Sequence, residues 1–218
     1  MYLHLKPEED INSKNSIFTS IKANETLVLF HSFFIAKIYL IIQTMSFLEK
    51  LHDISCFIFD VDGVLTDGSV HVQEDGSLLR TMNIKDGYAI RHAVDKGYAI
   101  FIITGGKSTG VQSRLVNLGI PKENIFMAVQ EKGKLMSELL KSKKIDPEKA
   151  VYMGDDIPDY APMRLVNLPC CPKDAVPEVK AVSQYVSAFD GGKGCVRDIL
   201  EKVMRVQGNW NVLDPVNF

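Results

Sequence analysis

Two aspartates with one residue between them, Asp60 and Asp62, are the side chains in this sequence best placed to do chemistry. They follow directly on the apolar run Ile54–Phe59, whose bulky, β-favouring residues predict a strand buried on both faces. Gly63 comes next and lets the chain bend close to a ligand. Ligands of open α/β sheets bind at the carboxyl ends of the strands, so we expect the site at this turn.

Four further polar side chains stand at comparable places. Thr104 ends a second apolar run, Asp155 and Asp156 end another, and Lys132 begins a predicted helix. The carboxyl ends of neighbouring parallel strands lie side by side, so these groups should meet Asp60 at one edge of the sheet. At least three carboxylates would then converge, which is costly unless a cation neutralises them.

This convergence predicts a magnesium-dependent phosphoryl transfer. Oxygen ligands indicate a hard metal ion, and a small number of carboxylates suits Mg²⁺, which keeps water ligands and takes up substrate phosphate. Asp60 would attack phosphorus to form an aspartyl-phosphate, while Asp62 would protonate the leaving alkoxide and then activate water. Mg²⁺, Thr104 and Lys132 would stabilise the charge on the phosphoryl oxygens.

Each motif alone has a simpler explanation. The D-x-D-G pattern also occurs in calcium loops and in metal-dependent glycosyltransferases, and Thr104-Gly105 is also an ordinary strand-to-helix turn. Asp155-Asp156 could be a helix cap, and Lys132 a surface charge. Their occurrence together, in order and each at a predicted strand end or helix start, favours phosphoryl transfer.

The elements that would position these side chains alternate along the chain. Asp75-Gly76 between two β-like runs predicts a β-hairpin over residues 69–83. Further strands are predicted at 98–103, 124–127, 150–153, 168–171 and 184–187, and helices at 87–94, after Ser108, and at 131–140, 175–181 and 194–206. Such repeated strand–helix units are typical of an α/β fold with a doubly wound parallel, Rossmann-like sheet.

Composition and charge narrow the function classes. The chain has 218 residues, of which 46% are hydrophobic, and a net charge of -2. This suits one globular domain, placed at 45–208 and followed by a tail at 209–218. The chain has no excess of basic residues that would indicate a nucleic-acid partner. The four cysteines lack the spacing of a zinc site and indicate a reducing compartment, so we expect a cytoplasmic protein.

Residues 1–44 differ in character from the rest. Their apolar run Leu27–Ile42 is interrupted by Lys37 and is shorter than the roughly 20 residues that span a bilayer. Acidic residues before the run and the lack of a small-residue cleavage site after it argue against a signal peptide. We interpret Met45 as the true start and residues 1–44 as an extension outside the fold, with a membrane-associated segment as the alternative. No membrane contact is expected for residues 45–218.

At these motifs the sequence resembles the haloacid dehalogenase superfamily, from about Leu51 to Gly208. The matching segments are Asp60–Val64, Thr104, Lys132 and Gly154–Asp156. The resemblance implies that Mg²⁺ is held by Asp60, by the backbone carbonyl of Asp62 and by Asp155, with Asp156 and Asp159 supporting the metal site.

The spacing of the motifs leaves no room for a cap domain, because the 36 residues between Asp67 and Thr104 already hold a hairpin, a helix and a strand. A capless chain of this kind resembles the 3-deoxy-D-manno-octulosonate 8-phosphate phosphatases, which serve lipopolysaccharide precursor biosynthesis. The matching phrases are Asp60–Gly68, Asn83–Tyr88 with Arg91, and Gly191–Arg197. The resemblance implies a homotetramer whose hairpins form a shared barrel and whose active sites are completed by a neighbouring subunit.

The same resemblance implies a set of substrate-binding residues. They are Asp62, Asn83, Ile84, Lys85, Asp86, Gly87, Arg91, Gly105, Gly106, Arg114 and Lys132. Lys85 stands where the family has arginine, which keeps the charge but loses the two-point contact to a carboxylate. Gly106 replaces another arginine, so that contact is missing or comes from Lys107. Gly106 does not match the glutamate of nine-carbon sugar-acid phosphatases either, so the eight-carbon substrate is preferred and the nine-carbon acid is the alternative.

Two functions of other classes fit the sequence less well. A non-catalytic oligomeric partner of a sugar-activating enzyme would not need every chemical group to be intact, as they are here. A receiver domain that stores phosphate on an aspartate would have no acid/base group such as Asp62. The Gly191–Gly194 segment remains open between a plain loop before a helix and an element that docks the tail or the substrate.

Overall fold

The computed structural model of the protein describes residue 37 and residues 47–210. The compact unit that carries the sheet spans Glu49–Phe218, and Met1–Leu48 form a second unit. Apart from residue 37, the predictions for residues 1–44 lie outside the described residues, as do those for residues 211–218 of the tail. Within the described part of the chain, no helix is both long and apolar enough to cross a membrane.

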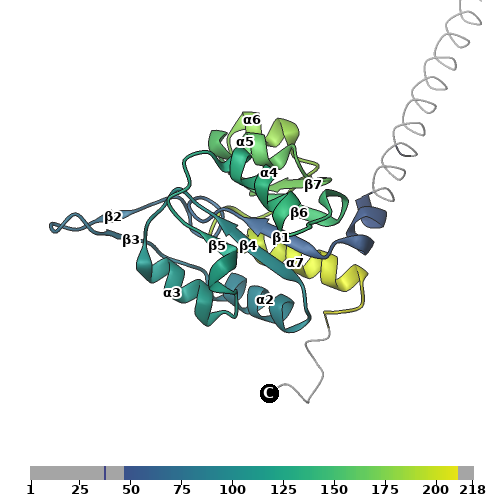
Figure 1. Ribbon diagram of the computed structural model, residues 1–218, viewed down its shortest axis with the longest axis horizontal. Coiled ribbons are helices and arrows are strands. Elements are labelled where there is room, and N and C mark those ends of the chain that lie inside the picture. The colour runs from purple at the N-terminus through teal and green to yellow at the C-terminus, as the bar shows by residue number, and fades with distance from the viewer. Residues whose placement is uncertain (1–36, 38–46, 211–218) are drawn as a thin grey trace, which may run out of the picture. The chain divides into compact units, whose positions relative to one another are not determined.

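A six-stranded parallel sheet forms the centre of the larger unit (Figure 1). Its strands, in spatial order, are β5 (Ile125–Phe126), β4 (Ala99–Ile103), β1 (Cys56–Phe59), β6 (Ala150–Met153), β7 (Leu168–Cys171) and β8 (Tyr185–Val186). Because β1 pairs in parallel with β4 on one side and with β6 on the other, the strand order reverses at β1. Ligands of such sheets bind at this switch point. The predicted doubly wound parallel sheet is confirmed.

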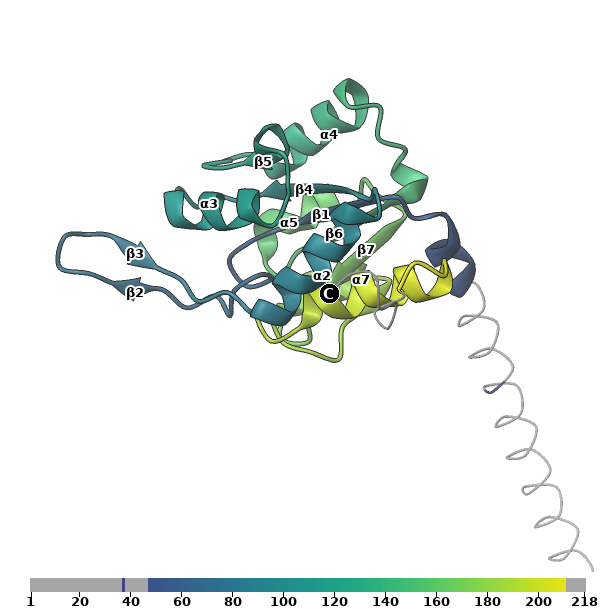
Figure 2. The same ribbon diagram turned by 90° about the horizontal axis from the view of Figure 1, so that it is seen from below.

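Helices cover both faces of the sheet (Figures 1 and 2). On one face lie α4 (Lys132–Ser142), α5 (Ile157–Met163) and α6 (Pro177–Val182); on the other lie α2 (Ile84–Asp95), α3 (Thr109–Asn117) and α7 (Cys195–Val206). Short 3-10 turns occupy Lys122–Asn124 and Pro147–Lys149. Residues 49–53, before the sheet, are helical.

The core packs around β1, the strand that directly precedes the Asp60–Gly63 turn. Successive side chains of a strand point to opposite faces. Ile58 joins a buried cluster with Met136 of α4, whereas the rings of Phe57 and Phe59 point to the other face and stack at 6.1 Å. Phe57, Ile58 and Phe59 are fully buried, and each such burial contributes about 1.5–3 kcal/mol. The turn that follows therefore starts from a fixed position.

Helix starts follow the capping residues. Asn83 caps α2 by accepting a hydrogen bond from the Lys85 amide at 2.8 Å, so this helix begins at Ile84, earlier than predicted. The predicted boundary was late because the apolar periodicity begins only after Gly87. Ser108 caps α3 as expected, accepting from the Val111 amide at 3.3 Å.

The predicted hairpin is present and projects away from the sheet (Figure 2). Its strands β2 (His71–Val72) and β3 (Leu78–Leu79) are antiparallel, and Gly76 takes φ +80° in the turn. The ladder is only two residues long on each side, and an isolated hairpin of this kind is marginally stable in water. The segment from β1 to β4 holds this hairpin and α2, as expected for a capless chain.

Candidate active site

The ends of three adjacent strands enclose one cavity. Asp60 and Asp62 follow β1, Thr104 follows β4 and Asp155 follows β6. The cavity has a volume of about 540 Å³ and is lined by Asp60, Asp62, Gly68, Thr104, Gly105, Gly106, Val129, Gln130, Lys132, Asp155, Asp156, Pro158 and Asp159. The structure therefore brings these groups together at one edge of the sheet, as predicted.

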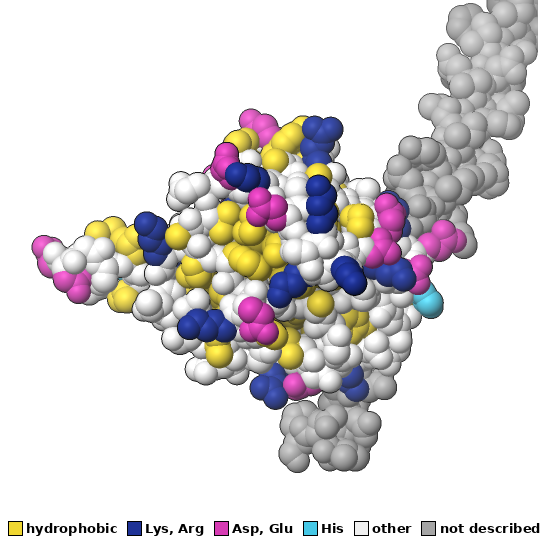
Figure 3. Space-filling model, in the orientation of Figure 1, with side chains coloured by type: hydrophobic (Ala, Val, Ile, Leu, Met, Phe, Trp, Pro, Cys, Tyr) yellow, Lys and Arg dark blue, Asp and Glu magenta, His cyan; other side chains and the backbone are white. Residues whose placement is uncertain are grey.

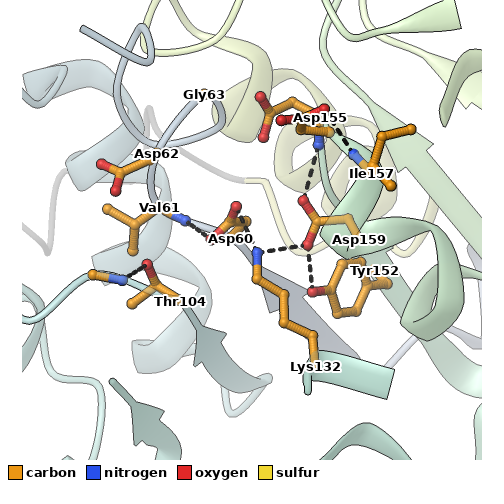
Figure 4. Close-up of polar contacts among 12 residues, drawn as sticks. Asp60, Val61, Asp62, Gly63, Thr104, Lys132, Tyr152, Asp155, Ile157 and Asp159 are labelled. Carbon is orange, nitrogen blue, oxygen red and sulfur yellow. Dashed lines mark hydrogen bonds and ion pairs between the residues drawn. The ribbon is translucent and has the colours of Figure 1, made fainter. Parts of the chain in front are cut away.

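Lys132 joins two of the carboxylates. It is the first residue of α4, and its Nζ lies 2.7 Å from Asp60 Oδ2 and 2.8 Å from Asp159 Oδ1 (Figure 4). Burial of the ammonium opposes its charge, but the two carboxylates outweigh burial and raise the pKa of Lys132. Lys132 is therefore a buried, permanently charged group and not a surface charge.

Asp60 is held rigidly at the bottom of the cavity. Its Oδ1 accepts a hydrogen bond from the Val61 amide at 2.6 Å, and its Oδ2 faces Lys132. Burial, with the nearby Asp159 carboxylate, raises the pKa of Asp60 above its ordinary value, and Lys132 offsets only part of this rise. A nucleophile needs such a fixed orientation toward the cavity.

Asp159 anchors this group from the other side. It is completely buried and accepts hydrogen bonds from Lys132, from the Tyr152 hydroxyl at 2.8 Å and from the Asp155 amide at 3.3 Å. Tyr152, on β6, was not predicted as part of the site, because a single tyrosine in an apolar strand has no distinguishing signal. Figure 4 shows the resulting chain from Tyr152 through Asp159 and Lys132 to Asp60.

Asp155 completes an arrangement that fits Mg²⁺. Its Oδ1 is buried with no hydrogen-bond partner among the described residues, and carboxylate oxygens of Asp60, Asp155 and Asp159 lie within 4.8 Å of one another. Burial and the Asp159 charge raise the pKa of Asp155 to about 7. Three carboxylates facing one ammonium leave excess negative charge that a hard divalent cation would neutralise. The donor set is all oxygen, as Mg²⁺ prefers.

Gly63 leaves the space that Asp155 occupies. It has φ +87°, and a β-carbon at this position would lie 1.9 Å from Asp155 Oδ2. A side chain here would therefore both strain the backbone and push Asp155 out of the cluster. Asp156 lies at the exposed rim, where its Oδ1 caps α5 by accepting from the Ile157 amide at 2.8 Å.

Thr104 presents polar groups on the β4 side of the cavity. Its hydroxyl is almost completely buried and accepts a hydrogen bond from the Gly106 amide at 3.1 Å. This contact folds the Thr104–Gly106 turn around the hydroxyl, and both glycines line the cavity. The turn therefore offers hydroxyl and backbone groups at the place expected for phosphate oxygens.

Arg80 is a second site residue that the sequence did not reveal. It directly follows β3 of the hairpin, and its guanidinium donates to both oxygens of Asp62, with Nε 2.5 Å from Oδ1 and Nη2 3.0 Å from Oδ2. Its guanidinium also lies beside Gly106, because a β-carbon on Gly106 would lie 3.6 Å from Arg80 Nη2.

The predicted substrate segment at the start of α2 does not line this cavity. Ile84 is 79% exposed and Lys85 is also exposed. Arg91 lies on the surface of α2, 3.0 Å from Asp95, and Arg114 lies on α3, with its Nη2 2.7 Å from where a Gly87 β-carbon would be. These side chains do not reach the Asp60 cavity within one chain.

Asp86 and Asn83 instead tie α2 to the loop before α7. Asp86 is 1% exposed and accepts from the Arg197 amide at 2.7 Å, while Asn83 Nδ2 donates to the Gly192 carbonyl at 3.2 Å. The Gly192 amide in turn donates to the Val64 carbonyl at 2.9 Å. The Gly191–Gly194 loop thus packs directly on the catalytic turn, and a β-carbon at Gly191 would lie 2.0 Å from the Gly63 carbonyl oxygen.

Comparison with known protein families and proteins gives a consistent result. Residues 123–197 match the family described as haloacid dehalogenase-like hydrolase. A 3-deoxy-D-manno-octulosonate 8-phosphate phosphatase from Escherichia coli is 35% identical over 161 residues, which cover 74% of this chain and 85% of that protein.

Solved structures agree. A putative phosphatase of the same name from Vibrio cholerae has a TM-score of 0.72 at 32% identity, covering 77% of this chain and 92% of that one. The enzyme from Moraxella catarrhalis, solved with magnesium, phosphate and 3-deoxy-D-manno-octulosonate, has a TM-score of 0.72 at 29% identity, covering 76% and 94%.

Proposed function

The chain belongs to the 3-deoxy-D-manno-octulosonate 8-phosphate phosphatases of the haloacid dehalogenase superfamily, and on this premise we propose how it works. It is a magnesium-dependent phosphomonoester hydrolase that releases phosphate from 3-deoxy-D-manno-octulosonate 8-phosphate. The observation that carries this function is the Asp60 carboxylate, held by Lys132 beside the unpartnered oxygen of Asp155.

Mg²⁺ would be held by Asp60, by the backbone carbonyl of Asp62 and by Asp155, with Asp156 and Asp159 in support. The ion supplies Lewis-acid charge that neutralises the carboxylates and the bound phosphate. The crowding of three carboxylates and the unpartnered oxygen of Asp155 support this assignment.

The reaction has two steps on this chain's own residues. In the first, a carboxylate oxygen of Asp60 attacks phosphorus, the bond from phosphorus to the sugar oxygen breaks, and Asp62 gives its proton to the leaving alkoxide. In the second, Asp62 takes a proton from water, which attacks the aspartyl-phosphate and frees Asp60 and phosphate. Lys132 and the Thr104–Gly106 turn bind the phosphoryl oxygens in both steps.

Recognition of the sugar acid needs a second subunit in this proposal. The residues from Asn83 to Arg91, together with Arg114, are substrate-binding candidates, but they do not line the cavity of their own chain. The hairpin exposes large apolar side chains, with Val72 72% and Leu79 53% exposed. Figure 3 shows hydrophobic side chains along the projecting flap. A homotetramer that buries these hairpins would bring the segment of one chain to the cavity of the next.

We also place the enzyme in the cytoplasm. All four cysteines are free and buried, and Cys170 and Cys171 are adjacent in β7 without forming a disulfide. Free thiols of this kind are typical of a reducing compartment.

The experiment that tests the function is phosphate release from the eight-carbon and the nine-carbon sugar-acid phosphates, compared by kcat/KM. We expect the eight-carbon substrate to be preferred and Asp60→Asn to abolish turnover. Undiminished turnover in Asp60→Asn would overturn the mechanism, and a preference for the nine-carbon acid would change the substrate but not the chemistry.

A further inference from the structure

The hairpin contributes one side chain to the catalytic turn. The side chain of Arg80 is only 8% exposed, although the residue sits at the base of an otherwise exposed flap. Among the described residues, both hydrogen bonds to the Asp62 carboxylate come from this guanidinium. A two-point contact of this kind fixes the plane of the carboxylate as well as its position.

Gly106 provides the space for this pair. A β-carbon at Gly106 would lie 3.4 Å from Asp62 Oδ2 and 3.6 Å from Arg80 Nη2, so a longer side chain would compete with the guanidinium for the same volume. The small residue after Thr104-Gly105 and the arginine on the hairpin thus fit together, although they come from different elements.

The two catalytic aspartates are held by different parts of the fold. Lys132, from a helix packed on the sheet, holds Asp60, whereas Arg80, from the hairpin, holds Asp62. Arg80 is not among the residues that line the cavity, whereas Asp62, to which its guanidinium donates, does line it.

We propose that Arg80 is a positioning residue that orients the Asp62 carboxyl group toward the leaving oxygen and the attacking water, and so links the hairpin to acid/base catalysis. The inference rests on the acid/base role proposed for Asp62. Proton transfer requires a heavy-atom separation of about 2.6–3.2 Å, and a free aspartate side chain on a turn would populate this geometry only part of the time.

The test separates the two chemical steps with p-nitrophenyl phosphate, whose leaving group needs no proton. Without an oriented Asp62, Asp60 should still attack this substrate, and the aspartyl-phosphate should then hydrolyse slowly. Arg80→Met should therefore give a stoichiometric burst of nitrophenolate followed by a slowed steady state. With the sugar-acid phosphate, which needs both steps, kcat should fall by about 10- to 100-fold, part of the 10²–10⁴ that acid/base catalysis supplies, while KM stays nearly constant.

Four further variants make the result decisive. Arg80→Lys keeps the charge but loses the two-point contact, so it should recover only part of the steady-state rate, and added guanidine should partly rescue Arg80→Ala. Arg205→Ala removes an exposed arginine that pairs with Glu201 on α7 and should behave as wild type. Asp62→Asn should give the full burst of nitrophenolate, followed by almost no steady-state turnover.

Each remaining outcome has a defined meaning. Three outcomes would overturn the role of Arg80. The first is wild-type kcat in both Arg80→Met and Arg80→Lys, and the second is full activity in Arg80→Lys alone. The third is a raised KM with unchanged kcat. If Arg80→Met loses both the burst and the steady-state rate, Arg80 has a general structural role, and the proposal is again overturned. If Asp62→Asn shows no burst and stall, the acid/base assignment of Asp62 fails, and this failure is visible separately from that of Arg80.

Discussion

Lys132 and Asp60 lie 2.7 Å apart, and both side chains are almost completely buried. The two residues come from different elements, the start of α4 and the end of β1, so their contact exists only in the folded chain. Asp159 shares the same ammonium at 2.8 Å. A single cation therefore balances two carboxylates, and removing it should have consequences for both stability and chemistry.

Lys132→Met should lower both the free energy of unfolding and the rate of phosphate release. Breaking a buried ion pair by removing one partner costs about 3–5 kcal/mol, so the free energy of unfolding without metal should fall by an amount of this order. Phosphate release should fall by at least about 100-fold, the loss typical of one electrostatic contact to the reacting group. Urea unfolding and steady-state kinetics measure the two effects. Lys134→Met is the matched control, because its ammonium is exposed and lies 3.9 Å from Glu131; an equal loss there would contradict the prediction.

Gly63→Ala should lose metal binding and activity. Alanine at φ +87° costs about 1–2 kcal/mol, and its β-carbon would also collide with Asp155 Oδ2 at 1.9 Å. Gly76→Ala is the control for the backbone cost alone, since Gly76 has φ +80° and no atom within 4 Å of the added carbon. Isothermal titration with Mg²⁺ should show weakened binding in Gly63→Ala only. Unchanged Mg²⁺ affinity in that variant would show that Asp155 is not a metal ligand.

Mg²⁺ should stabilise the folded chain through the same carboxylates. At a hundredfold excess over its Kd, a ligand adds about 2.7 kcal/mol, which corresponds to a rise in Tm of about 5–10 °C for a chain of this size. Chelation with EDTA should reverse the rise, and Asp155→Asn should abolish it while leaving the metal-free chain folded. A full shift in Asp155→Asn would be incompatible with the proposed site.

Tyr152→Phe should destabilise the fold without changing its shape. The variant removes one hydroxyl that donates to Asp159 at 2.8 Å inside the core. A hydrogen bond to a charged group contributes about 1.5–3 kcal/mol, and the free energy of unfolding should fall by that order. Activity at low temperature should fall less than in Lys132→Met, because Asp159 keeps its contact with Lys132. A neutral effect on stability would mean that the hydroxyl is not needed to hold Asp159.

The cysteines should be inert toward thiol reagents in the native protein. Burial raises the pKa of Cys56 to about 12 and also raises the pKa of Cys170, Cys171 and Cys195, so all four stay protonated at mildly alkaline pH. The thiolate is the reactive form. Ellman's reagent should therefore react slowly with the folded chain and rapidly with four thiols in denaturant. Rapid labelling of any cysteine in the native protein would contradict its burial.

The hairpin should control assembly and, through it, activity. Val72→Glu combined with Leu79→Glu places charges on the exposed apolar surface of the flap, where burial against another chain would become costly. Sedimentation should show a smaller species, and turnover of the sugar-acid phosphate should fall with it. Gln73→Glu, between them at the tip, is the control for charge alone. A double variant that keeps the size and activity of the wild type would contradict the proposed tetramer.

Most elements could be predicted from local pattern. The limits of β6 and β7 agree with the predicted 150–153 and 168–171, because each is a short apolar run between clear breaks. The start of α2 was missed because the apolar periodicity begins after the residues that Asn83 caps. Local pattern thus identifies where a chain is buried and where it turns, and is less sensitive to helix ends.

The residues of the candidate site also divide into those that local pattern predicts and those that it does not. Asp60, Asp62, Thr104, Lys132 and Asp155 were predictable, because each stands at a strand end or helix start whose place in a parallel sheet follows from chain order. Arg80 and Tyr152 were not, although each contacts a site carboxylate.

The sequence by itself determined the fold class, the reaction and the order of the catalytic groups, because alternating apolar runs and turns dictate which side chains follow the strands. The tertiary structure alone decided which charged side chains pair. Arg80 contacts Asp62, which is 18 residues away in the chain, and Lys132 contacts Asp159, which is 27 residues away. Asp86, a predicted substrate residue, is buried against the amide of Arg197, 111 residues away. Such contacts depend on where packing places each side chain in space, and no local pattern of residue types encodes that distance.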